Sequence, residues 1–293
     1  MRAVSDARQR RGSRRGLTLV ELAAAMVLSG VVVAALWRML DAGGRFFREQ
    51  ASVVEARRAL RDAAEVLGSE LRPLDPSGGD LVALGPDSIS LRAHRSLAFV
   101  CAPPDAAAGR IAVFDSLLFG FRAVDPARDR ALVFLEGDPR VPEDDGWLDF
   151  GIASVGEARC DGRPGTGLVL QGGTAALDAV TVGSPVRTYE RVVYRTYADG
   201  DGAWWLGQRA FSGGAWAPIS PVAGPLQAGA GLECRALDTA GGGTTDLLAA
   251  ARVECEVRAL SSEVLQEPGG RQRRFADSLR ISVAPRNGRR GGS

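Results

Sequence analysis

The feature that most constrains this chain is an uninterrupted apolar run at residues 17–37, which contains a single charged side chain, Glu21. As an α-helix this run would be roughly 31 Å long, enough to cross the hydrocarbon core of a bilayer. A carboxylate inside lipid costs on the order of a few kcal/mol unless it finds a partner, and the run holds no Lys, Arg or His. Glu21 therefore either lies near the lipid headgroups or meets a cation from another chain.

The segment in front of this run is strongly basic. Residues 1–16 contain six Arg and one Asp and end in Gly16. Positive charge before a membrane span keeps the N-terminus in the cytoplasm and directs the following chain across the membrane. In an ordinary secretory signal the small residues of the cleavage site follow a shorter apolar region, whereas Gly16 precedes the run. A cut after Gly16 would create an α-amine on Leu17, and Glu21 of a neighbouring chain could pair with that cation.

Residues 15–21, Arg-Gly-Leu-Thr-Leu-Val-Glu, resemble the type IV (class III) prepilin signal of type IV pilins and type II secretion pseudopilins. The resemblance implies cleavage between Gly16 and Leu17 by a membrane aspartyl prepilin peptidase, followed by N-methylation of Leu17. It also implies that Glu21, at the fifth mature position, guides the docking of subunits into a filament. Leu17 is a mild departure, because Phe or Met is commoner at the first mature position.

Charge and length limit what the rest of the chain can be. Because the leader carries a side-chain charge of +5, its removal changes the formal charge of the chain from +1 to −4. An acidic balance of this kind gives no case for nucleic-acid binding. After the leader and a long helix are subtracted, about 220 residues remain, which is ample for a globular head.

The helical pattern continues beyond the apolar run but becomes amphipathic. One stripe is formed by Val53, Ala56, Leu60, Ala64, Leu67 and Leu71. This three-or-four spacing is typical of a helix with one buried face. Pro73 and the Pro- and Gly-rich residues 75–79 end the pattern,. We therefore expect a spine helix over residues 17–72, of which the first part is a membrane span and the second part needs a globular partner.

From residue 80 onward, short β-type runs alternate with Gly, Pro and Asp, which predicts an antiparallel β-rich head over residues 80–286 and a flexible tail over 287–293,. The expected strands are 88–93, 116–123, 131–136, 148–155, 168–171, 179–183, 186–197, 203–211, 232–237, 252–260 and 275–284. The order of the last runs resembles the C-terminal half of larger minor pilins and J-type pseudopilins. The expected fold class is α+β and pilin-like.

The four cysteines would lie outside the cytoplasm in this topology, where an even count favours disulfides. Cys234 and Cys255 flank a predicted turn almost symmetrically, so opposed strand positions would bring them close enough to bridge,. We predict the pair Cys234–Cys255 and, by elimination, the pair Cys101–Cys160. Reduced, buried thiols are the alternative.

Other chemistry has weak support in the sequence. Asp199 and Asp201 lie in the run 198–202, which is a strong hairpin signal and a much weaker candidate for a calcium loop, because no later Glu completes it,. No other metal site and no cofactor are expected. His94 is the only histidine, and we interpret it as a surface or capping residue rather than as a catalytic base,. We therefore expect no enzymatic activity.

Taken together, these observations predict a minor pilin or pseudopilin precursor. Its expected partners are the prepilin peptidase, other pilin subunits, the inner-membrane assembly platform and the lipid bilayer. It would span the bacterial inner membrane once, with a cytoplasmic N-terminus and a periplasmic head, before it enters a filament. A pilus, a secretion pseudopilus and a DNA-uptake fibre all remain open. The alternative from another class is a single-span, membrane-anchored periplasmic enzyme or binding module.

Overall fold

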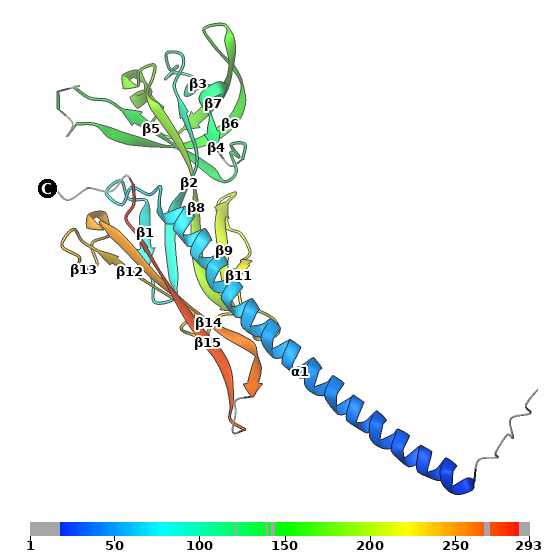
Figure 1. Ribbon diagram of the computed structural model, residues 1–293. Helices are drawn as coiled ribbons and strands as arrows, with labels where there is room; N and C mark the ends of the chain where they lie inside the picture. The colour runs from blue at the N-terminus through cyan, green and yellow to red at the C-terminus, as the bar shows by residue number, and fades with distance from the viewer. Residues whose placement is uncertain (1–17, 121, 139, 142–143, 267–269, 287–293) are drawn as a thin grey trace, which may run out of the picture. The chain divides into compact units, whose positions relative to one another are not determined.

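The computed structural model describes residues 18–120, 122–138, 140–141, 144–266 and 270–286 (Figure 1). The chain divides into two compact units, residues 1–51 and residues 52–293. The described part of the first unit is the beginning of one long helix. The second unit contains the end of that helix and a head of antiparallel strands. The expected α+β class is confirmed.

Helix α1 spans Leu19–Leu71 and contains no proline. Ala and Leu, both strong helix formers, are frequent along it,. The helix ends where the sequence predicts, because a residue that precedes proline, here Arg72 before Pro73, is disfavoured in the helical region,. In the second unit one face of α1 is buried. This face consists of Ser52, Ala56, Ala59, Leu60, Ala63, Leu67 and Leu71. The predicted stripe is thus largely right, although Val53 and Ala64 lie at its edge and are half-buried.

The head contains fifteen strands among the described residues, and they form two sheets. The larger sheet consists of β1 (Leu81–Leu84), β2 (Ser88–Phe99), β3 (Arg110–Phe114), β4 (Phe119–Gly120), β5 (Asp129–Leu135), β6 (Gly146–Cys160), β7 (Arg163–Gln171), β8 (Pro185–Ala198), β9 (Trp204–Ser212), β10 (Ala215–Trp216) and β11 (Ser220–Ala223). The smaller sheet consists of β12 (Leu232–Leu237), β13 (Gly243–Thr244), β14 (Arg252–Gln266) and β15 (Gln272–Val283). All pairings are antiparallel, as the alternating sequence pattern predicts,.

Strand β8 organises the larger sheet. One of its edges pairs with β2 along nearly its whole length, from Pro185 opposite Phe99 to Arg195 opposite Ser88. Its other edge is shared, because its first half pairs with β5 and its second half pairs with β9. The sheet therefore has two parts that are joined through β2 and β8.

Two hydrophobic clusters follow from this division. The first lies between α1, the smaller sheet, and the halves of β2 and β8 that contain Leu91 and Val192. The second lies between β3, β5, β6, β7 and the opposite halves of the same two strands, which contain Ala98 and Val186. Both clusters are built from Leu, Val, Ile and Ala side chains with little or no exposure, so each supplies its part of the head with its own core,.

A buried ionic network lies where these two parts meet. Arg95 on β2 donates to both carboxylate oxygens of Glu70 on α1, at 3.1 Å each, and to Glu190 on β8, at 3.0 Å. Arg122 donates to both oxygens of Asp129, at 2.7 and 2.8 Å. The side chains of Glu190 and Asp129 are only 6% and 0% exposed. Charges this deeply buried require partners, and the network therefore couples the helix to three strands.

Several strand predictions need correction. The described residues of the range 116–123 do not form a full strand, because Asp115–Leu117 is a 3₁₀ turn and, of the residues described there, only Phe119–Gly120 is extended as β4. Residues 179–183 form no strand, since the 3₁₀ helix Thr174–Ala179 and a turn occupy this stretch. Strand β3 was not predicted. By contrast, β12 has the predicted bounds, and β8 and β9 differ from theirs by one residue at each end.

Candidate functional site

The first described residues form the cap of helix α1. Thr18 precedes the first helical residue, Leu19, and Glu21 lies three positions after Thr18. The backbone N–H of Glu21 donates to the hydroxyl of Thr18 at 3.2 Å, while the N–H of Thr18 donates to Oε2 of Glu21 at 2.9 Å. This reciprocal capping box satisfies two N–H groups that a helix N-terminus otherwise leaves unpaired. The sequence Thr-Leu-Val-Glu therefore sets where the helix begins.

The capping box uses only one of the two oxygens of the Glu21 carboxylate. The Thr18 hydroxyl also donates to Oε2, at 2.9 Å. In the described part of the chain no hydrogen bond or ion pair is found for Oε1. Glu21 can thus cap its own helix and still present an acceptor to another group.

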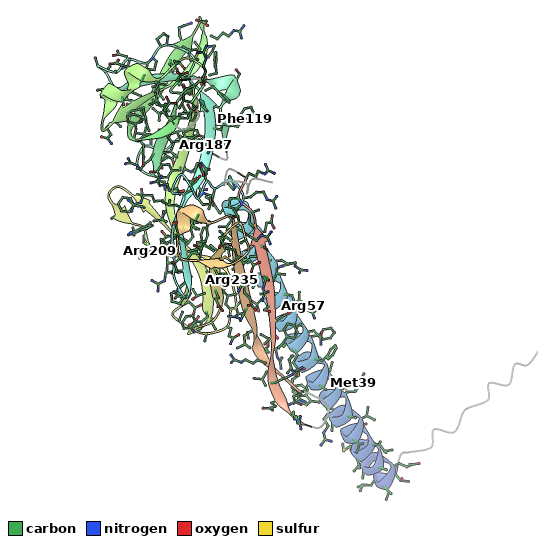
Figure 2. The ribbon with its side chains drawn as sticks, turned by 90° about the vertical axis from the view of Figure 1, so that its left-hand side faces the viewer. Met39, Arg57, Phe119, Arg187, Arg209 and Arg235 are labelled. Atoms are coloured by element: carbon green, nitrogen blue, oxygen red, sulfur yellow. A yellow bond between two sulfur atoms is a disulfide. The ribbon has the colours of Figure 1, made fainter. Side chains whose placement is uncertain are left out.

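From Leu22 to Trp37 the helix is apolar on every side and exposed. Figure 2 shows side chains standing out from α1 around Met39. The exposed apolar side chains of the first unit are Leu19, Val20, Leu22, Met26, Val27, Leu28, Val31, Val32, Val33, Leu36, Trp37, Met39, Leu40, Phe46 and Phe47. Within the described residues, α1 is the one helix that is long and apolar enough to cross a membrane. A helix without a polar face needs lipid or other helices around it.

The predicted cleavage site lies outside the described residues. Gly16, Leu17 and the leader precede the first described residue, Thr18, and the predicted tail, residues 287–293, follows the last one. The processing of Gly16 and Leu17 therefore stays a prediction. Glu21, the predicted assembly residue, is described by the structure and lies at the third position of the helix.

The cysteines lie in the two predicted pairs. Cys234 on β12 is directly opposite Cys255 on β14, and their Cα atoms are 4.1 Å apart. Cys101 is joined to Cys160, the last residue of β6, with Cα atoms 5.3 Å apart. Cys101 and Cys160 are both buried. The first bond links neighbouring strands, whereas the second closes a much longer stretch of chain.

Removing the two disulfides separately is expected to destabilise the head by different amounts. The Cys101–Cys160 bond spans 59 residues and the Cys234–Cys255 bond spans 21. By loop-closure entropy, the double Cys→Ser variants should lower the free energy of unfolding by roughly 4 and 3 kcal/mol, respectively. Urea unfolding of the full chain in detergent, followed by tryptophan fluorescence, measures this difference. An unchanged midpoint after either double substitution would show that the corresponding thiols are normally reduced.

Asp199 and Asp201 lie in the turn between β8 and β9. Oδ1 of Asp199 accepts the N–H groups of Asp201 and Ala203, at 3.0 and 2.9 Å, and Oδ2 accepts the indole N–H of Trp205 at 2.8 Å. The Asp199 carboxylate thus already has protein donors that fix the hairpin turn. Among the described residues, no group of three or more His, Cys, Asp or Glu could hold a metal ion.

His94 is not the surface residue that the sequence suggested. Its side chain is 11% exposed, and Nε2 is 2.7 Å from Oδ2 of Asp80, which is itself buried. His94 can reach Asp80 because the backbone at Asp80 is held against β2, where the N–H of Arg92 donates to the Asp80 carbonyl at 2.8 Å. No local pattern predicts this pairing, since the two residues are fourteen positions apart, one in a loop and one in a strand.

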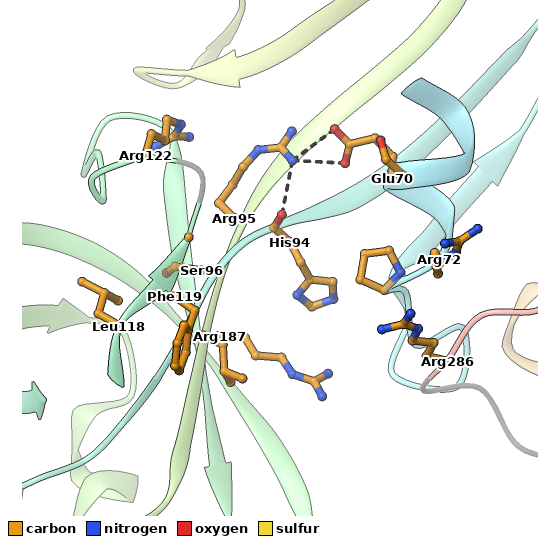
Figure 3. Close-up of a pocket in the computed structure, with 14 residues that line it drawn as sticks. Glu70, Arg72, His94, Arg95, Ser96, Leu118, Phe119, Arg122, Arg187 and Arg286 are labelled. Carbon is orange, nitrogen blue, oxygen red and sulfur yellow. Dashed lines mark hydrogen bonds and ion pairs between the residues drawn. The ribbon is translucent and has the colours of Figure 1, made fainter. Parts of the chain in front are cut away.

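The sequence did not predict a pocket that lies beside His94 (Figure 3). Its volume is about 1270 Å³. Polar and apolar groups from α1, β2, β4, β8, the adjoining loops and the segment after β15 line it: Ser69, Glu70, Arg72, Pro73, His94, Arg95, Ser96, Leu97, Leu118, Phe119, Gly120, Arg122, Arg187 and Arg286. These residues are scattered through the sequence, so only the fold brings them together.

Comparison with known proteins identifies the N-terminal segment. Residues 11–37 match the prokaryotic N-terminal methylation motif, which is the signature of the prepilin-type signal of type IV pilins and pseudopilins. The resemblance predicted from the sequence is therefore confirmed, and the motif supports a type IV pilin-like protein. Proteins with this motif are structural rather than catalytic. No curated protein and no solved structure matches the chain.

The segment that matches the motif overlaps the exposed apolar part of helix α1. The motif ends at residue 37, and the exposed apolar part of α1 begins at Leu19. The motif and the apolar helix together fit a protein that is anchored in a membrane. The motif also implies processing by a prepilin peptidase and assembly with other pilins.

Proposed function

We propose that this protein is a minor pilin or pseudopilin, a structural subunit of a type IV pilus or a type II secretion pseudopilus. The proposal rests on one observation: the methylation motif at residues 11–37 overlaps an exposed apolar helix that has Glu21 in its first turn. In this proposal the prepilin peptidase cuts between Gly16 and Leu17, and Leu17 is then N-methylated. The leader of six Arg and one Asp is discarded.

The chemistry of assembly follows from the helix terminus. Cleavage would place the cationic amine of Leu17 one residue before Thr18, at the end of the helix where the backbone dipole already disfavours positive charge. Among apolar helices that cation needs a carboxylate, because an unpaired charge in a dry environment costs several kcal/mol. Glu21 of a neighbouring subunit supplies it with Oε1, the oxygen that the capping box leaves free. The pair would set the axial stagger between adjacent subunits.

The proposed route begins in the inner membrane. The basic leader holds the N-terminus in the cytoplasm and the head is translocated to the periplasm, where the cysteines meet an oxidising environment. The assembly platform then extracts the helix and packs it among those of other pilin subunits. The head includes two cores and two sheets, and so large a head would crowd its neighbours along a filament. A low-copy position at the tip, or a role in priming assembly, fits this size best.

Quantitative mass spectrometry of sheared filaments from the native host tests this function. The protein is expected in the filament fraction, at a small fraction of the abundance of the main subunit. In cells that lack the prepilin peptidase it should stay in the inner membrane. Recovery from the membrane alone in both strains would contradict a filament role and favour an anchored module.

A further inference from the structure

Besides the exposed Arg72, two arginines that line the pocket of the head, Arg187 and Arg286, have no carboxylate within ion-pair distance among the described residues. Arg95 and Arg122, which also line it, are held by Glu70, Glu190 and Asp129. For the guanidinium groups of Arg187 and Arg286, no ion pair or hydrogen bond occurs within the residues that the structure describes. Figure 3 shows both groups and the ring of His94 around the same open space. The positive charge of the pocket is therefore only partly compensated by the protein.

Arg187 is held in place by packing rather than by a carboxylate. Its guanidinium carbon lies 4.5 Å from the centre of the Trp147 ring, a cation–π contact that fixes the orientation of the planar group,. Burial lowers the pKa of Arg187, while the more distant carboxylates of Asp80 and Asp75 act in the opposite direction. A half-buried arginine that is oriented but not paired is a typical binding group for a carboxylate or phosphoryl ligand, because its N–H groups form a rigid fork.

His94 adds a second unsatisfied group at the same place. Its Nε2 is bound to Asp80, but its Nδ1 is buried and has no hydrogen-bond partner among the residues that the structure describes. A buried polar atom without a partner is uncommon in a native structure, and an ordered water or ion is one of the usual reasons. Arg286 is anchored near this point, because its backbone N–H donates to the carbonyl of Arg72 at 2.9 Å.

The wall on the other side of the pocket is apolar. Leu97, Leu118 and Phe119 line it, and the Phe119 side chain is 60% exposed although it is large and aromatic. Figure 3 shows Phe119 and Leu118 on the side of the pocket away from Arg286. An exposed aromatic residue beside a few convergent polar groups is common in ligand sites.

We propose that this pocket binds an anionic ligand in which carboxylate or phosphoryl groups are joined to an apolar body. The anionic groups would bind Arg187 and Arg286, and the apolar body would lie against Leu97, Leu118 and Phe119. The site belongs to the head alone and does not depend on filament assembly, so the two proposals can fail separately.

Calorimetric titration of the full chain in detergent, at low ionic strength, tests this site with three probes. Phenylsuccinate carries two carboxylates on an apolar body, its diamide has the same body without charge, and inorganic phosphate has charge without the body. We expect phenylsuccinate to bind at least about tenfold more tightly than either of the others, because charged hydrogen bonds and apolar burial both contribute. Equal binding of the acid and the diamide, or of phenylsuccinate and phosphate, would overturn the proposal.

Variants then place the binding at the pocket. Arg187→Gln and Arg286→Gln should each weaken phenylsuccinate binding by roughly tenfold, whereas Arg195→Gln, an exposed arginine on the same strand as Arg187, should leave it unchanged. Phe119→Ser should weaken phenylsuccinate but not phosphate. Arg286 is exposed, so its substitution tests the site even if Arg187→Gln does not fold. Unchanged binding by Arg286→Gln, or equal losses in all three arginine variants, would contradict a specific site.

Discussion

Glu21→Gln is expected to leave helix α1 intact and to remove the protein from the filament. Glutamine can still accept the Thr18 N–H in a capping box, so the helix should begin at the same residue. The negative charge that would meet the Leu17 amine of a neighbour is lost, and an uncompensated cation among apolar helices costs several kcal/mol. The ratio of filament-bound to membrane-bound protein should fall at least about tenfold, as measured by mass spectrometry of the two fractions.

Glu55→Gln is the matched control for this substitution. Glu55 is exposed on the same helix but lies outside the apolar run. The Glu55→Gln variant loses the same charge, and its incorporation into the filament should equal that of the wild type. If Glu21→Gln also assembles normally, the Glu21 carboxylate is merely a tolerated charge near the headgroups, and the proposed pairing is wrong.

Among single substitutions, Glu190→Ala is expected to produce the largest loss of stability in the head. The Glu190 carboxylate lies 3.0 Å from Arg95, 3.4 Å from Arg122 and 3.6 Å from Arg128. Its removal leaves three guanidinium groups with only Glu70 and Asp129 as partners. Removing one side of a buried ionic contact costs about 3–5 kcal/mol, and the free energy of unfolding, measured with urea on the full chain in detergent, should fall by that amount.

Glu157→Ala provides the comparison for Glu190. Glu157 is exposed on β6, and surface substitutions of this kind usually change stability by less than about 0.5 kcal/mol,. Tyr194 also belongs to the buried network, because its hydroxyl donates to Glu70 at 3.1 Å. Burial raises the pKa of this hydroxyl. A small loss of stability for Glu190→Ala, similar to that of Glu157→Ala, would mean that water reaches the network and screens its charges.

The parts of the fold that depend on local pattern could be predicted from the sequence. A long apolar run followed by a stripe and Pro73 defines a helix, and its end at Leu71 agrees with the structure. Alternating charged and apolar residues around Cys255 define a half-buried strand, and the hairpin places Cys234 directly opposite. In both cases the deciding residues are close together in the chain or symmetrical about one turn.

The parts that depend on tertiary contacts could not be predicted. Strand β3 has only five residues, Arg110–Phe114, and it is a strand because it pairs with β7. Residues 116–123 are apolar enough for a strand, but of the residues described there only Phe119 and Gly120 pair with a strand, β2. His94 and Arg187 owe their surroundings to α1, to the turn at Asp80 and to Trp147, which no local pattern reveals.

Intact-mass and N-terminal analysis of the protein isolated from its native membrane is the most direct test of the central claim. The prediction is a chain that begins at Leu17, carries one added methyl group on its amine and lacks the sixteen-residue leader that contains six Arg. A mature-length chain with this modified amine gives Glu21 the cation it needs. A chain that still begins upstream of Leu17 would contradict both the processing and the filament assembly proposed for this protein.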